Sequence, residues 1–164
     1  MGSPWRALAL GVVVGFGILL GADILNLSAQ AADPRIGTWK LSVAKSKYSP
    51  GPPPQSNTLK VEASGQGEKV TTEGVNAAGA PIKTQYTANF DGKDYPLTGS
   101  ANADMVSLKR IDARTTVRTD KKDGKVVLTL TRVVSQDGKT MTVTTKGTNP
   151  QGQTVDNFAV WEKQ

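Results

Sequence analysis

Residues 37–41 read GTWKL and begin the part of the chain that decides its fold. From residue 36 onward, short runs of alternating apolar and polar residues, rich in Thr and Val, are separated by Gly, Asp and Asn. This alternation is typical of half-buried β-strands, and no window of helical periodicity competes with it. The sequence predicts about ten strands, at 36–43, 57–64, 68–75, 81–90, 93–97, 105–111, 114–121, 125–134, 139–147 and 153–162.

Turn residues between these runs predict hairpins. The tripeptide DGK occurs at 91–93, 123–125 and 137–139. Asp and Gly supply the positive φ angles that tight hairpin turns require. Because the other connections are mostly as short, we expect each strand to pair antiparallel with the next one along the chain.

Alternation also indicates which face of a strand is buried. Ile82, Thr84 and Tyr86 share one face of their strand, while Lys83 and Gln85 share the other. One face therefore packs on an interior and the other meets water. Because open edges favour aggregation, we expect an all-β meander that closes into a β-barrel of about 8–10 strands. A two-sheet sandwich is the alternative.

The first 31 residues have a different composition. They contain Arg6, then an uncharged and mostly apolar run at 7–22, and then AQA at 29–31. This order is typical of a secretory signal peptide. It predicts a hydrophobic signal helix at 1–31 and an exported domain, periplasmic or secreted, at 32–164.

The alternative for this segment is an uncleaved membrane anchor, which would have to place Asp23 in lipid. The chain has 20 basic and 14 acidic residues, a net charge of +6, and no cysteine. Disulfides and a lipidated cysteine anchor are therefore excluded, and stability must come from the sheet and its core.

The GTWKL opening and the closing AVWEKQ at 159–164 resemble those of the intracellular fatty-acid-binding proteins. The G-x-W opening is shared with the wider lipocalin superfamily (calycins), and GTWKLSVAKSKYSPGP is similar to the opening of exported bacterial lipocalin-like proteins. The resemblance implies structural roles for Gly37, which lets the first strand bend, and for Trp39, which plugs the closed end of the barrel. It also implies an apolar or amphipathic ligand inside.

The chain departs from the fatty-acid-binding proteins where they carry two lid helices. Residues 44–56 read AKSKYSPGPPPQS, with prolines at 50 and at 52–54. Proline disfavours a helix here and favours an extended segment. We therefore expect no helical lid, and access to the interior near this proline loop.

A second departure concerns ligand charge. The Arg-x-Tyr that contacts a carboxylate in the family aligns with Ala159 and Trp161, so the arginine is missing. Arg132 could replace it, since it could share a strand face with Leu128 and Leu130. The alternative is that Arg132 points to water, because long basic side chains reach solvent easily.

The leading hypothesis is a binding module for a small apolar or amphipathic molecule. The candidate ligand-binding residues are Tyr86, Leu128, Leu130, Arg132, Met141 and Trp161. The rival hypothesis is a structural or interaction protein of the cell envelope, with a barrel filled by its own side chains and a basic contact surface.

Catalysis has little support. Histidine and cysteine are absent, which excludes the usual zinc sites, thiol nucleophiles and Ser-His triads. Asp91, Asp94 and Asp123 lie in predicted turns that explain them without catalysis. We expect no enzyme activity, no metal site and no cofactor.

Basic residues gather between residues 109 and 125. We expect them to form a solvated surface, with contact to anionic lipid or envelope polysaccharide as the alternative. Few aromatic residues and an exported location argue against a nucleic-acid partner, and we expect a monomer. The basic residues are Lys109, Arg110, Arg114, Arg118, Lys121, Lys122 and Lys125.

Overall fold

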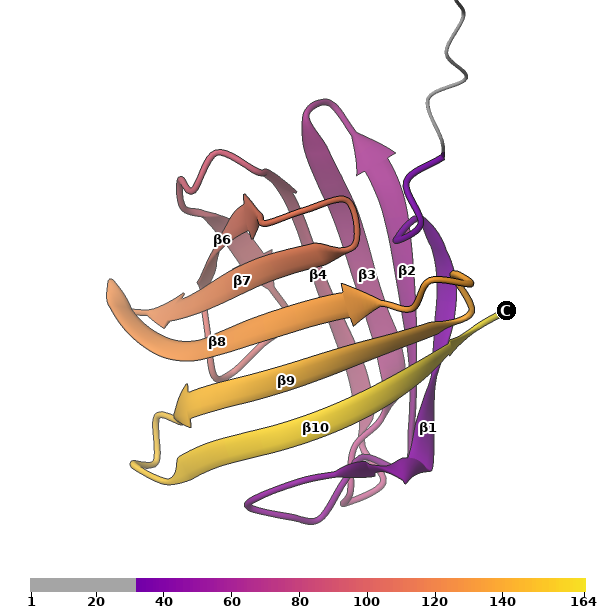
Figure 1. Ribbon diagram of the computed structural model, residues 1–164. Helices are drawn as coiled ribbons and strands as arrows, with labels where there is room; N and C mark the ends of the chain where they lie inside the picture. The colour runs from indigo at the N-terminus through magenta and orange to yellow at the C-terminus, as the bar shows by residue number, and fades with distance from the viewer. Residues whose placement is uncertain (1–31) are drawn as a thin grey trace, which may run out of the picture. The chain divides into compact units, whose positions relative to one another are not determined.

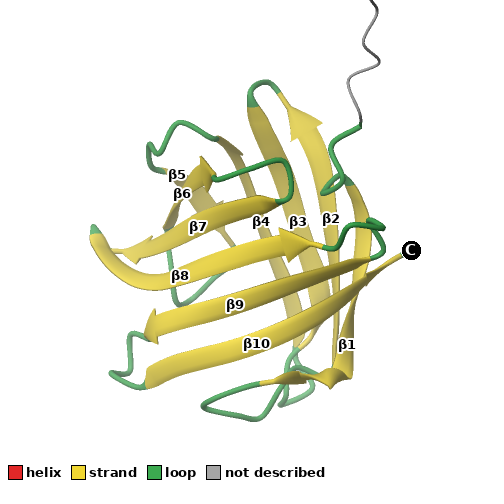
Figure 2. Cartoon of the chain, viewed as in Figure 1, coloured by secondary structure: helices red, strands yellow, loops and turns green. Residues whose placement is uncertain are grey.

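The computed structural model describes residues 32–164, and ten β-strands form its regular structure (Figures 1 and 2). The all-β prediction is confirmed. The predicted signal helix, its cleavage after Ala31 and the alternative anchor lie outside the described residues. The strands are β1 (Gly37–Lys47), β2 (Ser56–Ser64), β3 (Gly67–Val75), β4 (Pro81–Asn89), β5 (Tyr95–Thr98), β6 (Met105–Arg110), β7 (Thr115–Lys122), β8 (Lys125–Val134), β9 (Thr140–Thr148) and β10 (Thr154–Lys163).

The strands form a closed barrel in the order β1-β10-β9-β8-β7-β6-β5-β4-β3-β2. Each strand pairs antiparallel with its neighbours in sequence, and β1 closes the ring by pairing with both β2 and β10. Trp39 lies opposite Leu59 on one side and Lys163 on the other. Figure 1 shows β7 to β10 crossing in front of the steeper β2, β3 and β4. The closed barrel is thus confirmed in preference to the sandwich.

The end of β1 is where the predicted strand boundaries differ most. The sequence predicts an end at residue 43, but the strand continues to Lys47. Pairing with β10 is interrupted after Ser42 and resumes at Lys47. The Ser46 hydroxyl bridges the irregularity, because it donates to the Ser42 carbonyl at 2.7 Å and accepts from the Val160 N–H at 3.0 Å. A side-chain bridge of this kind leaves no sign in the alternation pattern.

The proline segment between β1 and β2 contains no helix, as predicted. The Ser49 N–H donates to the Asn157 side chain at 2.9 Å, and the Ser49 carbonyl accepts from the Asp156 N–H at 2.8 Å. The Gln55 N–H donates to the Val75 carbonyl at 2.9 Å. These bonds fix the segment against β10 and β3. Within residues 32–164, no helix has the length and apolar character needed to cross a membrane.

Trp39 is part of the core, as its predicted structural role requires. Its side chain is 0% exposed, and its indole N–H donates to the Arg35 carbonyl at 2.9 Å. The Lys163 ammonium lies 5.0 Å from the ring centroid. The segment before β1 and the end of β10 therefore both pack on this indole.

Gly37 at the start of β1 has a φ of +136°, which L side chains rarely adopt. We expect Gly37→Ala to lower the free energy of unfolding by about 1–2 kcal/mol, mainly through backbone strain. Urea unfolding measures the loss. Gly51→Ala is the control, because its new Cβ would lie 3.7 Å from the nearest atom. Equal stabilities of the two variants would contradict this role for Gly37.

Candidate ligand-binding cavity

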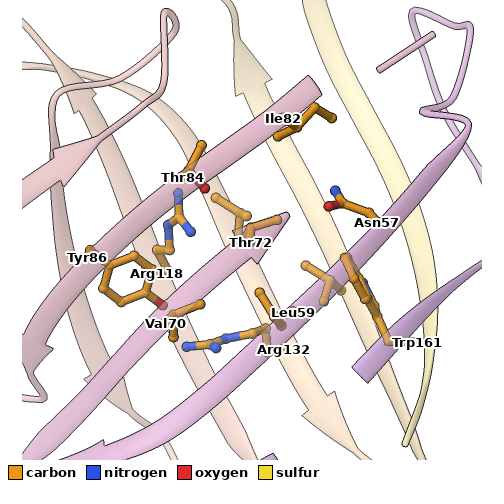
Figure 3. A pocket seen from close by; sticks show the side chains of 12 residues that line it. Asn57, Leu59, Val70, Thr72, Ile82, Thr84, Tyr86, Arg118, Arg132 and Trp161 are labelled. Carbon is orange, nitrogen blue, oxygen red and sulfur yellow. The ribbon is translucent and has the colours of Figure 1, made fainter. Parts of the chain in front are cut away.

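A cavity of about 260 Å³ lies inside the barrel, between β2, β3, β4, β7, β8, β9 and β10. Most of its wall is apolar, and polar side chains project into it from several strands (Figure 3). Four of the six ligand-binding residues that the sequence predicts line this cavity, namely Tyr86, Leu130, Arg132 and Trp161. The lining residues are Asn57, Leu59, Val70, Thr72, Ile82, Thr84, Tyr86, Arg118, Leu130, Arg132, Val143 and Trp161.

Two predicted lining residues do not reach the cavity. Met141 is 0% exposed and belongs to the packed core, opposite Trp161 on β10. Leu128 is half-buried and lies opposite Asp120, where the pairing of β7 and β8 shifts register. The shift begins beyond Leu128, on the side away from Leu130, so Leu128 is still in the same pairing register as Leu130. It lies past the end of the cavity, whose wall on β8 stops at Leu130.

Glu68 and Arg132 form a buried ion pair beside the cavity, and Tyr86 bonds to the same carboxylate. We call these three residues the Glu68 cluster. The Tyr86 hydroxyl donates to Glu68 Oε1 at 2.7 Å, and the Arg132 guanidinium donates to the same oxygen. The Arg35 guanidinium lies 3.7 Å from Glu68 Oε2. Arg132 is 4% exposed and Glu68 1%. Arg132 therefore faces the interior of the barrel, and the alternative that it points to water is wrong.

A second ion pair, between Arg118 and Asp120, also lies inside the barrel. The Arg118 guanidinium donates to the two carboxylate oxygens of Asp120, at 2.5 and 2.7 Å. Its central carbon lies 4.9 Å from the centroid of the Tyr86 ring. The prediction that Arg118 belongs to a solvated basic surface is wrong, because alternation along β7 turns Thr116, Arg118 and Asp120 to the inside.

Burial in this interior changes acid–base properties. Desolvation raises the pKa of the Tyr86 hydroxyl, and the charge of Glu68 adds to the rise. Desolvation opposes the charged form of Arg132, but Tyr86 and Glu68 outweigh it and raise the pKa of this guanidinium. The cluster therefore keeps a neutral phenol between a carboxylate and a cation.

The raised pKa of Tyr86 gives a pH-dependent stability. A phenol whose pKa is higher in the folded than in the unfolded chain stabilises the fold below about pH 10, and this stability is lost as the pH rises towards the folded pKa. Near neutral pH, Tyr86→Phe should cost about 1.5–3 kcal/mol, the value of a hydrogen bond to a charged group. Between about pH 9 and about pH 11, the parent should lose more stability than Tyr86→Phe. Urea unfolding across this range measures both, and parallel pH profiles would contradict the burial of this phenol.

Three polar atoms of the cavity wall have no hydrogen-bond partner among residues 32–164. They are Arg132 Nε and Trp161 Nε1, which are donors, and Asn57 Oδ1, which is an acceptor. Buried polar atoms without partners are rare and costly in folded proteins. All three atoms are almost completely covered by other protein atoms, so they do not offer open hydrogen-bonding positions to a molecule in the cavity.

The predicted ligand-binding residues omit several lining residues that alternation places on the same strand faces. Thr72 shares a face with Val70, and Ile82 and Thr84 share one with Tyr86. Glu68 also lies on the inward face of β3, but a glutamate in a strand with one exposed face is ordinarily assigned to water.

The acidic residues of the turns serve local structure. Asp91 accepts the Lys93 N–H at 3.0 Å and the Tyr95 hydroxyl at 2.8 Å, and Asp94 pairs with Lys121 at 2.8 Å. Within residues 32–164, no three His, Cys, Asp or Glu side chains are grouped so that they could hold a metal ion.

No protein-family model matches the sequence, and no curated protein matches it. One solved structure with a similar fold is the zebrafish ileal bile acid-binding protein in complex with cholic acid. The two chains are 13% identical with a TM-score of 0.50, and the likeness covers 80% of this chain and 99% of the other. The comparison supports a closed barrel fold similar to that of the bile acid-binding protein, and at this identity it shows the fold alone.

Proposed function

We propose that this protein is a binding module that holds a small apolar or amphipathic molecule inside its barrel. The observation that carries the proposal is the cavity, whose mostly apolar wall includes the polar side chains of Thr72, Thr84 and Arg118. Ligand pockets typically combine an apolar lining with a few placed polar groups. The bile acid-binding protein that shares the fold binds cholic acid, which supports the proposal by analogy.

The volume of the cavity limits the ligand. About 260 Å³ lies below the range of roughly 300–1,000 Å³ common for ligand pockets. A single short chain fits such a space better than a polycyclic molecule. Asn57 and Ile82 line the cavity and lie near the starts of β2 and β4, next to the proline segment and to the β3–β4 turn. We therefore place access beside the proline segment.

The proposal includes export, on the signal-peptide pattern of residues 1–31, and no catalytic role, on the absence of His and Cys. The rival hypothesis of a filled barrel with a basic contact surface is weaker. An unfilled space lies inside the barrel, and Arg118 of the basic run faces that space.

A cavity-filling variant tests the proposal. Thr72 lines the cavity, whereas its neighbour Thr71 lies on the outer face of β3. Calorimetric titration with octanol, octanamide and octanoate should give at least one complex with the parent. Thr72→Trp should weaken that complex by about tenfold or more, or ~1.4 kcal/mol, and the matched control Thr71→Trp should preserve it.

Filling a packed interior can destabilise a fold, so Ile82→Trp, at the edge of the cavity, provides a second blocking variant. Native mass spectrometry of the purified protein, with solvent extraction of whatever accompanies it, gives an independent measurement. Failure of the parent to bind any of the three molecules, or unchanged binding by both folded blocking variants, would overturn the proposal.

A further inference from the structure

We propose that the cavity selects uncharged amphiphiles over carboxylates, and that Glu68 determines this selectivity. The inference rests on the proposed binding function and specifies its ligand class. That class is a short apolar chain with one neutral polar end, such as a primary amide.

The first observation is that each arginine of the interior already has a carboxylate. Arg132 pairs with Glu68. Arg118 makes two hydrogen bonds to Asp120, at 2.5 and 2.7 Å. The third pair joins Arg35 and Asp33, with Nε to Oδ1 at 2.9 Å. Asp33 also accepts from Arg110 at 3.0 Å, and this second arginine is 42% exposed. Next to the cavity, Arg118 and Arg132 face Asp120 and Glu68, and the formal charge of these four groups is zero.

A charged ligand would disturb this balance. A carboxylate that enters the cavity loses its hydration, and it finds no arginine whose charge is free. It would also add a negative charge close to Glu68 and Asp120, whose like charges repel it. Desolvation without a matching cation makes burial of the ion unfavourable, whereas a neutral polar group avoids both costs.

The second observation is that neutral polar side chains line the cavity beside the ion pairs. Thr72 and Thr84 are among its lining residues. Figure 3 shows Asn57 and Trp161 on one side of the cavity, with Arg132, Arg118 and Tyr86 on the other. A threonine hydroxyl can donate and accept hydrogen bonds, and so can an amide, whereas a carboxylate can only accept.

Glu68 determines the selectivity because its carboxylate, which lies within the cavity wall, already pairs with the Arg132 guanidinium. Its Oε1 accepts from Arg132 and from Tyr86, so the position where a ligand carboxylate could bind this arginine is filled by the protein itself. Glu68→Gln keeps an oxygen acceptor at this position and removes one negative charge. The interior then has a surplus positive charge, which a ligand carboxylate can neutralise.

The test compares octanamide with octanoate, which have nearly the same shape and differ in charge near neutral pH. Calorimetry on the full-length parent should show octanamide bound about tenfold more tightly or better. Glu68→Gln should shift the ratio of the two affinities towards octanoate by about tenfold or more. Glu73→Gln is the matched control, because Glu73 is on the outer face of β3 and 58% exposed, and it should leave the ratio unchanged.

Each outcome decides one level of the proposal. Tighter binding of octanamide by the parent, with the shift in Glu68→Gln, supports neutral selectivity. Equal or tighter binding of octanoate by the parent would overturn it and leave the binding function standing. Binding of neither molecule, nor of octanol, would overturn the binding function itself. If Glu68→Gln does not fold, Asp120→Asn removes the other interior charge next to a cavity arginine and should shift the same ratio.

Discussion

Glu68→Ala is expected to lower the free energy of unfolding by about 3–5 kcal/mol, the cost of removing one partner of a buried ion pair. The side chain is 1% exposed and accepts hydrogen bonds from Tyr86 and Arg132. Its loss leaves a guanidinium buried without its counter-charge and a hydroxyl without its acceptor. Urea unfolding followed by circular dichroism measures the change.

Glu73→Ala on the same strand is the control. Glu73 pairs with Lys83 at 2.9 Å, but its side chain is 58% exposed. An exposed pair of this kind contributes about 0–1 kcal/mol, so its loss should be small. Replacing Glu68 and Arg132 together by leucine and methionine should recover much of the stability lost in Glu68→Ala, since no buried charge is then left unpaired. Equal losses in Glu68→Ala and Glu73→Ala would contradict the burial of the cluster.

Trp39→Ala is expected to cost about 3–5 kcal/mol, the usual range for deleting a buried tryptophan. The indole is 0% exposed and donates to the Arg35 carbonyl at 2.9 Å. Its deletion leaves a cavity in the core and removes the hydrogen bond that ties residue 35 to the barrel. Denaturant unfolding by circular dichroism measures the loss without depending on the removed fluorophore. Trp39→Phe should lose less, because it keeps an aromatic ring in the core. A Trp39→Ala variant within about 1 kcal/mol of the parent would show that the indole does not hold the core together.

The fold could be predicted because its signals are local. Alternation along 81–90 separates Tyr86 from Lys83, and the structure buries the first and exposes the second. The DGK turns set the hairpins, and a meander with short connections leaves few topologies. The end of β1 could not be predicted, because it depends on the bond between Ser46 and Val160, which are far apart in the sequence.

The cavity could be predicted only in part. The apolar candidates Leu130 and Trp161 were accessible from alternation, and four of the six predicted residues line the cavity. Arg118 and Glu68 were missed because a charged residue in a strand is ordinarily assigned to solvent, and its burial depends on a partner from a distant strand. Glu68 and Arg132 are 64 residues apart. Alternation puts Leu128 on the same face as Leu130, but it does not show how far along β8 the cavity extends.

The most direct test of ligand binding inside the barrel is the indole N–H signal of Trp161 in a ¹⁵N–¹H spectrum, recorded while octanamide is added to the full-length protein. The chain contains three tryptophans, and Trp161→Phe assigns the signal. Trp161 Nε1 has no partner among the described residues, whereas Trp39 Nε1 already donates to the Arg35 carbonyl. We expect the Trp161 signal to shift and saturate while the Trp39 signal stays in place. A Trp161 signal that stays unchanged in excess octanamide would contradict ligand binding in this cavity.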